Sequence, residues 1–331
     1  MSKLYSIDWG YEEEKLSVWN GKKMTHKMPK VEAGDVILTE NMPNKLAKPL
    51  IKDGAIVMRC SPNSSAAYRE KYNIPKTDDN DAIVIWDLYK DSPAKFRQMK
   101  EDSKLKQFYV NYEQLTKQIT AVKNRQWAAE DDDNKEYLAS LEKAKDLLAK
   151  KLTKELKRIP IYDTFLSKIK GIGPALAAGL ISEIGEIKRF DNVSNLYAYA
   201  GVHIKDNKAL KKQKGVVANW NSALRCLVCH GVPDQFVRQK SPIYNGIYAD
   251  EKARCAKIFE EDSGKAREDR RVQSLLHAER RARRKAGKIF LHHLWKAWRE
   301  LEGLPVPKPW VLEHGGHSKE ILPPTAYPGL T

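Results

Sequence analysis

The sequence of 331 residues predicts an α/β domain followed by an all-α region. Short apolar runs separated by turns fill residues 1–85, and Asn20-Gly21 between two of them is a strong hairpin signal. From residue 87 the chain is highly charged, and its apolar residues recur three and four positions apart, which is helical spacing. A formal net charge of +16 indicates a polyanionic partner, and nucleic acid is the natural one.

The α/β region contains several apolar runs of strand length and two helical segments. The strand-like runs are residues 4–7, 16–19, 36–38 and 55–58. Residues 44–51 carry apolar side chains at helical spacing, and a second helix is expected to begin at Asp78. Strands first, then a crossover helix, a further strand and an acidic helix are the order expected of a small RNase H-like sheet. In such a sheet the ends of adjacent strands bring Asp8 and Glu40 together.

Four carboxylates stand where such a sheet would let them meet. Asp8 and Glu40 each follow an apolar run, and Asp78 and Asp81 lie three apart at a helix start, which puts both on one face. Carboxylate oxygens suit Mg²⁺, and two ions roughly 4 Å apart stabilise the attacking and leaving oxygens of a phosphodiester. We therefore predict a two-Mg²⁺ nuclease site, where Mn²⁺ can substitute. Acidic residues at a helix start also favour the macrodipole and cap the first turn, so the pair alone has a structural interpretation.

The segments that carry these carboxylates resemble a known family. They are Ser6-Ile7-Asp8-Trp9-Gly10, Leu38-Thr39-Glu40-Asn41 and Lys76-Thr77-Asp78-Asp79-Asn80-Asp81-Ala82. Together they are similar to the DEDD set of RuvC-like nuclease domains, most closely those of insertion-sequence transposases that work with a bridge RNA. The resemblance implies a RuvC-like domain over residues 1–90, with Asp8, Glu40, Asp78 and Asp81 as catalytic metal ligands.

Residues 91–160 are expected to form a long helical hairpin. Apolar residues alternate spacings of three and four in two runs, 105–122 and 138–159, on either side of the polar stretch 130–134. So narrow a stripe is typical of a coiled coil. A hairpin packed on itself and a homodimer fit the pattern equally, and the homodimer is kept as an expected partner.

Pro160 breaks this pattern, and a helical domain is expected over residues 161–331. Gly171-Ile172-Gly173, between two predicted apolar helices, resembles a helix-hairpin-helix turn, in which amides at a helix N-terminus can bind a backbone phosphate. Lys168 and Lys170 flank the turn. The same glycines would also serve a tight turn that only requires positive φ.

The following segments resemble the C-terminal domain of the same transposases. They are Glu183 to Phe190 and Leu196 to Gly201. In those transposases a nucleophilic serine comes next, whereas residues 202–215 here contain none, and Ser222 is expected to cap a helix. Without that hydroxyl no phosphoserine intermediate can conserve bond energy for rejoining strands.

The order and size of the domains are similar to those of TasR-type proteins of tandem interspaced guide RNA systems, which join a RuvC-like domain to a Nop-like helical half. This resemblance implies RNA-guided cleavage of DNA, with a guide RNA and target DNA as partners. A bridge-RNA-guided recombinase and a non-catalytic guide-RNA scaffold remain as alternatives.

Basic residues in the last third of the chain are expected to bind nucleic acid. A lysine-rich loop and the arginine-rich run 267–288 place cations on shared faces, and the planar guanidinium suits phosphate. Such a run can also be a solvated helix face, but acidic residues are scarce after Asp269. The predicted contacts are Lys168, Lys170, Gly171, Gly173, Lys205, Lys211, Lys212, Lys214, Arg270, Arg271, Arg280, Arg281, Arg283, Arg284 and Lys288.

Other classes of site and location are not expected. No apolar run has the length of a membrane-spanning helix and no signal peptide opens the chain, so we expect a cytoplasmic protein without a membrane partner. Cys226 and Cys229 lie among apolar residues, so we expect them to be buried in a helix rather than to bind zinc.

Overall fold

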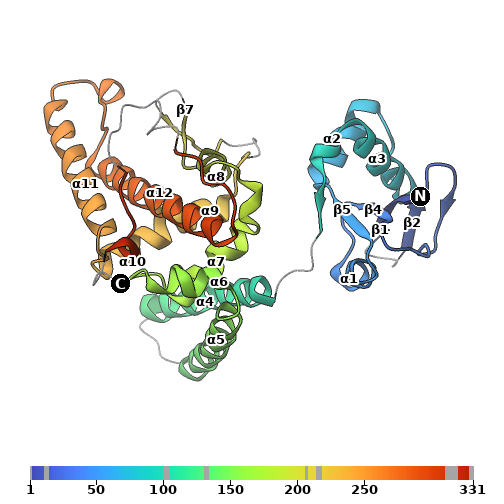
Figure 1. Ribbon diagram of the computed structural model, residues 1–331, viewed down its shortest axis with the longest axis horizontal. Helices are drawn as coiled ribbons and strands as arrows, with labels where there is room; N and C mark the ends of the chain where they lie inside the picture. The colour runs from blue at the N-terminus through green and yellow to red at the C-terminus, as the bar shows by residue number, and fades with distance from the viewer. Residues whose placement is uncertain are drawn as a thin grey trace. The chain divides into compact units, whose positions relative to one another are not determined.

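The computed structural model describes residues 2–10, 15–99, 104–129, 134–205, 208–213, 218–309 and 320–327. The chain divides into two compact units, Met1–Asp102 and Ser103–Thr331. The first unit is a sheet with helices on both faces, and the second is built almost entirely of helices (Figure 1). Both parts of the predicted α/β and all-α layout are therefore present. No helix in the described ranges has the length and apolar character needed to span a membrane.

A mixed six-stranded sheet forms the centre of the first unit. Its strand order is β3-β2-β1-β4-β5-β6. The strands are β1 (Leu4–Gly10), β2 (Lys15–Trp19), β3 (Met24–Thr25), β4 (Val36–Thr39), β5 (Ile56–Arg59) and β6 (Arg97–Gln98). Asn20 and Gly21 lie in the turn between β2 and β3, which are antiparallel, so the predicted hairpin is confirmed. β1 pairs antiparallel with β2 and parallel with β4, and Ile7 lies opposite Thr39.

Helices cover both faces of this sheet. They are α1 (Asn44–Lys52), α2 (Pro62–Tyr72) and α3 (Asp78–Asp91). Ala47 and Leu50 of α1 pack on Ile37, while Ile85 and Leu88 of α3 pack on Leu38, which points to the other face because side chains alternate along a strand. α3 begins at Asp78 as predicted.

α2 was not predicted from the sequence. Its only buried residue is Ser65, so it has no apolar stripe that would identify it as a helix. Local signals define it instead, because the Ser61 side chain caps its N-terminus by accepting a hydrogen bond from Ser64 N, and Pro62 occupies the first helical position. At its C-terminus Asn73 has a φ of 51°, the left-handed conformation that commonly ends helices.

The second unit begins with the two long helices that were predicted, but residues 91–99 of the predicted helical segment belong to the first unit, where β6 pairs with β5. α4 (Lys104–Ala129) and α5 (Lys135–Leu156) pack against each other through Ile119, Val122 and Leu141. Residues 130–133 of the predicted polar turn lie outside the described ranges. At the other end of the pair, Leu152 and Leu156 join the main core of the unit. The hairpin is therefore anchored in the helical core at its base.

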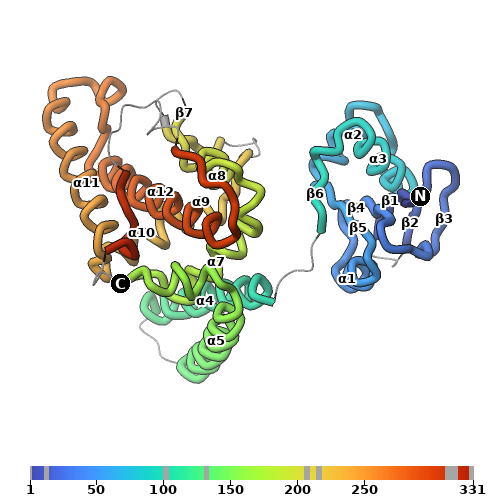
Figure 2. The backbone as a smooth tube through the Cα atoms, viewed as in Figure 1, coloured from blue at the N-terminus to red at the C-terminus, as the bar shows by residue number. Residues whose placement is uncertain are grey.

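Seven further α-helices complete the described part of the second unit. They are α6 (Pro160–Thr164), α7 (Pro174–Ile184), α8 (Val193–Tyr199), α9 (Ser222–Cys226), α10 (Val232–Arg238), α11 (Tyr244–Glu261) and α12 (Leu275–Leu301). α12 has α11 on one side and α8 on the other (Figure 2). Its C-terminal half is buried, and Trp295 Nε1 donates a 2.8 Å hydrogen bond to the carbonyl oxygen of Phe190. The short strands β7 (Ile204–Lys205) and β8 (Lys208–Ala209) pair antiparallel.

A π-helical turn, Leu227–Gly231, connects α9 to α10 and crosses α12 at close range. A β-carbon added at Gly287 would lie 1.9 Å from the carbonyl oxygen of Val228, so only glycine permits this approach. The expected burial of both cysteines is wrong for Cys226, which is exposed, whereas Cys229 is half-buried and packs against the main core of the unit.

Candidate active site and nucleic-acid interface

The first unit brings Asp8, Glu40, Asp78 and Asp81 into one neighbourhood. Asp8 lies on β1 and Glu40 directly after β4, each one residue beyond the paired residues Ile7 and Thr39. α3 lies across this edge, because the Ser6 hydroxyl donates a 2.6 Å hydrogen bond to the carbonyl of Ala82. At Gly10 an added β-carbon would lie 2.9 Å from Asp78 Oδ2, so glycine leaves room for that carboxylate.

The electrostatics of Asp8 reflect the negative charges of the other three carboxylates. Its side chain is buried, with 5% exposed. The pKa of Asp8 is raised to about 7, first by burial and then by the negative charges of Asp81, Glu40 and Asp78. Burial also raises the pKa of Asp81, which is opposed by Arg69. Such an excess of negative charge favours the binding of protons or cations.

Two of the four carboxylates are held by side chains of α2. Arg69 Nη1 donates a 2.6 Å hydrogen bond to Asp81 Oδ1, and the Ser65 hydroxyl donates one to Glu40 Oε2. Ser65 and Arg69 are four residues apart and share one face of the helix. Sequence reasoning missed both residues because it missed α2, and their spacing would have identified them once that helix was known.

Asp79 has a hydrogen-bond partner outside the four carboxylates. Its Oδ1 accepts a 2.6 Å hydrogen bond from the Ser17 hydroxyl on β2. On the helix, Asp79 lies about a quarter-turn from the face shared by Asp78 and Asp81. Asp79 therefore offers a matched control for either neighbour.

The donor set consists of carboxylates that repel one another, so both its oxygen atoms and its negative charge suit a hard divalent cation. Its arrangement does not converge on an ion, however. Among the described residues, no three His, Cys, Asp or Glu side chains are placed so that they could hold a metal together. The contacts of Arg69 and Ser65 account for this, because they direct oxygens of Asp81 and Glu40 toward α2.

The basic residues predicted to bind nucleic acid fall into two groups on and before α12. One group is bonded internally. Arg271 pairs with Asp262 and Glu261, and Arg283 pairs with Glu279 and Asp234. Arg270 donates hydrogen bonds to the carbonyls of Ser263 and Lys265. These arginines stabilise the helical unit, which corrects the expectation that the whole run faces a ligand.

The second group has no acidic partner within hydrogen-bond distance among the described residues. Arg280 is exposed, and Arg281 donates only a 3.3 Å bond to the carbonyl of Arg271. Arg284 is half-buried, and the Lys288 ammonium lies 4.5 Å from the centre of the Tyr197 ring. The positive charge of these residues is therefore available to a bound anion.

The other predicted contacts lie in two loops. Gly171 has a φ of 102°, so the turn requires glycine there, and Gly173 precedes α7 without a side-chain cap. Lys168 and Lys170 beside it are exposed. The helix predicted before this turn is only α6 followed by the 3-10 turn Leu166–Lys168.

In the lysine-rich loop, Lys211 and Lys212 are exposed. Lys205 belongs to β7 and its side chain is not described, while Lys214 lies outside the described ranges.

One segment in the middle of the second unit matches a known protein family. Residues 163–247 match the IS116/IS110/IS902 transposase family. This part of the chain is related to those transposases, and it contains the turn at Gly171, the two segments with a transposase resemblance, and α9. No curated protein matches the chain.

The transposase-related segment also contains Ser222, whose predicted role is wrong. Asn221 is the N-cap of α9, and its side-chain oxygen accepts a 2.9 Å hydrogen bond from Leu224 N. Asn221 is held in turn by Glu183 and the hydroxyl of Tyr199. Ser222 is therefore the first helical residue, with an exposed side chain.

Proposed function

We propose that this chain is a transposase-related enzyme that cleaves DNA phosphodiesters at the carboxylate group of its first unit, with a bound RNA selecting the target. The observation that carries the proposal is the grouping of three carboxylates around Asp8, whose pKa is raised to about 7. A strongly perturbed acid among other carboxylates is typical of functional sites. The match of residues 163–247 to a transposase family supports DNA as the substrate.

In this proposal Asp8, Glu40, Asp78 and Asp81 bind Mg²⁺ or Mn²⁺. Such ions, when bound, activate a water and stabilise the leaving oxygen of a phosphodiester. Asp8 and Glu40 come from paired parallel strands, so the sheet fixes their separation. Asp78 and Asp81 come from one helical turn, which sets them against the strand ends. A cation near Asp8 would favour its ionised form, since the three neighbouring carboxylates disfavour it.

The RNA component of the proposal rests on charge and on resemblance. The chain has a formal net charge of +16, and the unpaired cations on α12 are suited to phosphates. Basic surfaces bind the sugar-phosphate backbone but do not read bases. Pairing by a guide RNA would supply the sequence recognition that such a surface lacks.

A recombinase that both cuts and rejoins DNA is the second candidate. The transposase match over residues 163–247 favours it over a nuclease that only cuts. The absence of serine from residues 202–215 favours the nuclease, since rejoining through a covalent intermediate needs a nucleophile. Ser222 is the nearby hydroxyl that could serve, and trapping a covalent protein–DNA adduct after denaturation would decide between the two.

We also propose that the hairpin tip contacts a second copy of the chain. Trp127 near the end of α4 is 84% exposed, and Tyr137 at the start of α5 is 52% exposed. Aromatic side chains of this kind are enriched at protein interfaces. Sedimentation of the wild type and of Trp127→Ala tests this, and a monomeric wild type would contradict it.

The test of the main proposal begins with protein purified from cells that express its genomic neighbourhood, so that any bound RNA is retained. The RNA is sequenced, and the complex is incubated with matching duplex DNA and Mg²⁺. Cuts at RNA-directed positions are expected, and Asp8→Asn and Asp78→Asn should abolish them. Asp79→Asn is the matched control, because Asp79 is bonded to Ser17 instead.

Each outcome of this test has a distinct meaning. Bound RNA with no cuts in the wild type would indicate a scaffold. Cuts that survive Asp8→Asn would contradict the proposed site. Equal loss of activity in Asp78→Asn and Asp79→Asn would show that the substitutions disturb the folding of α3 rather than the chemistry of cleavage.

A further inference from the structure

Four cations from two helices gather where α12 crosses the π-helical turn. They are Arg225 of α9 and Arg281, Arg284 and Lys288 of α12, named here the α9–α12 basic cluster. The three residues of α12 are spaced three and four apart and so share one face. Gly287 fixes the distance between the elements, because its contact with Val228 brings α12 against the turn that follows α9.

The cluster holds like charges close together. The pKa of Arg284 is lowered by burial and by the positive charges of Arg281 and Arg225, while Cys229 and Glu251 oppose this shift. Burial lowers the pKa of Lys288, and Arg284 lowers it further. His277, one turn before Arg281, has its pKa lowered by burial and then by Arg281, Arg284, Lys211 and Arg280. A second set of cations therefore adjoins the cluster at the N-terminal end of α12.

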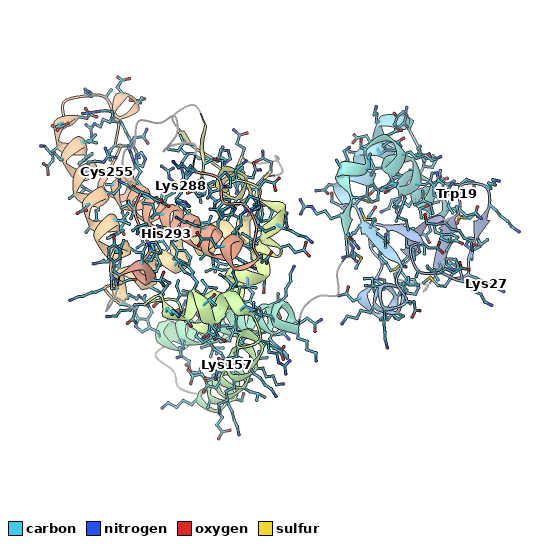
Figure 3. All side chains as sticks on the ribbon, in the orientation of Figure 1. Trp19, Lys27, Lys157, Cys255, Lys288 and His293 are labelled. Carbon is cyan, nitrogen blue, oxygen red and sulfur yellow. The ribbon has the colours of Figure 1, made fainter. Side chains whose placement is uncertain are left out.

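The side chains of the cluster are held in place by contacts other than ion pairs. The Arg225 guanidinium lies 5.0 Å from the centre of the Trp220 ring and donates a 2.6 Å hydrogen bond to the carbonyl of Leu210. The Lys288 ammonium lies over the ring of Tyr197 in α8. Figure 3 labels Lys288 on α12. Arg284 makes no hydrogen bond or ion pair with any residue in the described ranges.

Two other cations of the same helix, Arg283 and Lys285, show the opposite arrangement. Arg283 is bonded to Glu279 and Asp234, and Lys285 is bonded to Glu251. Glu251 also accepts two hydrogen bonds from Arg254, so its charge is already shared. Arg283 and Arg284 are adjacent, but only Arg283 has an acidic partner among the described residues.

We propose that the α9–α12 basic cluster binds the sugar-phosphate backbone of a nucleic acid. Half-buried guanidinium groups that repel one another are stabilised by an anion with several oxygens, and arginine binds phosphate through paired donors. Because burial and ring contacts already order these side chains, little freedom is lost on binding. Arg281 and Lys288 are seven residues apart, about 10 Å along the helix, so the cluster can contact successive phosphates of one strand.

This inference deepens the proposed function and rests on it for the identity of the ligand. Arg225 belongs to the transposase-related segment, whereas Arg281, Arg284 and Lys288 lie beyond it. The site is thus completed by a helix that the matched segment does not include.

The test compares variants of the full chain that remove one positive charge each. Arg284→Gln and Lys288→Gln remove cations of the cluster, and Arg283→Gln and Lys285→Gln are their matched controls on the same helix. Binding is measured by fluorescence anisotropy with a single-stranded RNA and with a duplex DNA, at several salt concentrations. Thermal unfolding of each variant is recorded in parallel.

We expect each cluster variant to bind about tenfold more weakly, the loss for one hydrogen-bonded charge. Its slope of log affinity against log salt should fall by about 1. The controls should keep their affinity and instead unfold at lower temperature. Loss confined to RNA would assign the site to the guide, loss confined to DNA to the target, and loss of both to backbone in general.

Two results would overturn the inference. One is wild-type affinity of Arg284→Gln for both ligands, and the other is equal weakening by Arg283→Gln and Arg284→Gln. Failure of the proposed function has a different signature. It would leave the wild type binding nucleic acid through Arg284 without cleaving DNA in any condition.

Discussion

Arg69 and Asp81 form an ion pair at the edge of the carboxylate group, with 2.6 Å between Nη1 and Oδ1 and side chains only 13% and 11% exposed. Arg69 comes from α2, and Asp81 lies in the first turn of α3. The guanidinium supplies a positive charge among carboxylates that repel one another. The Arg69 guanidinium therefore offsets part of the negative charge that a bound cation would offset. It also occupies Asp81 Oδ1, an oxygen that could otherwise bind the cation.

The first prediction is that Arg69→Gln lowers the free energy of unfolding and raises the affinity for Mg²⁺. Removing one partner of a nearly buried pair leaves Asp81 uncompensated, so we expect a loss of about 3 kcal/mol in unfolding free energy without metal. Mg²⁺ should restore more stability to this variant than to the wild type, since an oxygen of Asp81 is freed. Thermal unfolding and calorimetric titration with Mg²⁺ measure both effects.

Lys71→Gln is the control for that experiment, because Lys71 is an exposed cation of the same helix. It should change neither quantity. If Arg69→Gln bound Mg²⁺ no more tightly than the wild type, Arg69 would not compete with a cation. If Asp8→Asn also left Mg²⁺ binding unchanged, the cation site itself would be wrong.

The second prediction concerns the crossing of α12 and the π-helical turn. Gly287→Ala would place a β-carbon 1.9 Å from the carbonyl oxygen of Val228, so backbone must move. We expect a loss of about 3 kcal/mol, at the upper end of the usual cost of overpacking. Nucleic-acid binding should weaken as well, because α12 would carry Arg284 and Lys288 away from Arg225.

Gly246→Ala is the matched control, since an added β-carbon there meets nothing within 4 Å. Gly246 lies within α11, where alanine is favoured over glycine by roughly 0.5–1 kcal/mol. Chemical denaturation of both variants gives the comparison. Equal stability of Gly287→Ala and the wild type would mean that the close approach is not present in solution.

The arrangement of the carboxylates was predictable from sequence, whereas their partners were not. Asp8 and Glu40 each end an apolar run, and the ends of parallel strands meet at one sheet edge, so their proximity follows from local patterns. Arg69 was missed because α2 has no apolar stripe to mark it as a helix.

The pairing of the arginines on α12 depends on tertiary contacts. Arg283 is bonded to Asp234, which is 49 residues away in sequence, while its neighbour Arg284 has no such acid. Spacing along the helix shows which residues share a face, but it does not show what that face meets. Nucleic acid therefore stays a prediction as the ligand of the basic run, and only the fold shows which of its arginines have an acidic partner.

The third prediction is a loss of stability between pH 6.5 and pH 4 that depends on His293. Burial lowers the pKa of His293 to about 4, below the usual 6.5 of the unfolded chain. The unfolded state therefore binds the proton first as pH falls, and stability decreases until the folded form also protonates. At pH 5 the expected cost is about 2 kcal/mol.

His293→Gln isolates this contribution. Tyr244 lies 2.8 Å from His293 Nδ1 and the Ile321 carbonyl 2.7 Å from Nε2, and glutamine offers an acceptor and a donor but does not titrate. Unfolding free energies across this pH range should vary less in the variant. An unchanged slope would assign the pH dependence to other groups.

The fourth prediction separates cutting from rejoining. Ser222 is exposed at the start of α9, and in the described part of the chain its hydroxyl makes no hydrogen bond to a base that could activate it. We therefore expect Ser222→Ala to cleave DNA at the wild-type rate, and neither protein to form an adduct with DNA that survives denaturation. Asn221→Ala is a structural comparison, because loss of the α9 cap should cost about 1 kcal/mol. A wild-type adduct that disappears in Ser222→Ala would instead make this residue the nucleophile, and the enzyme would then be a recombinase whose serine lies on α9 rather than in the loop before it.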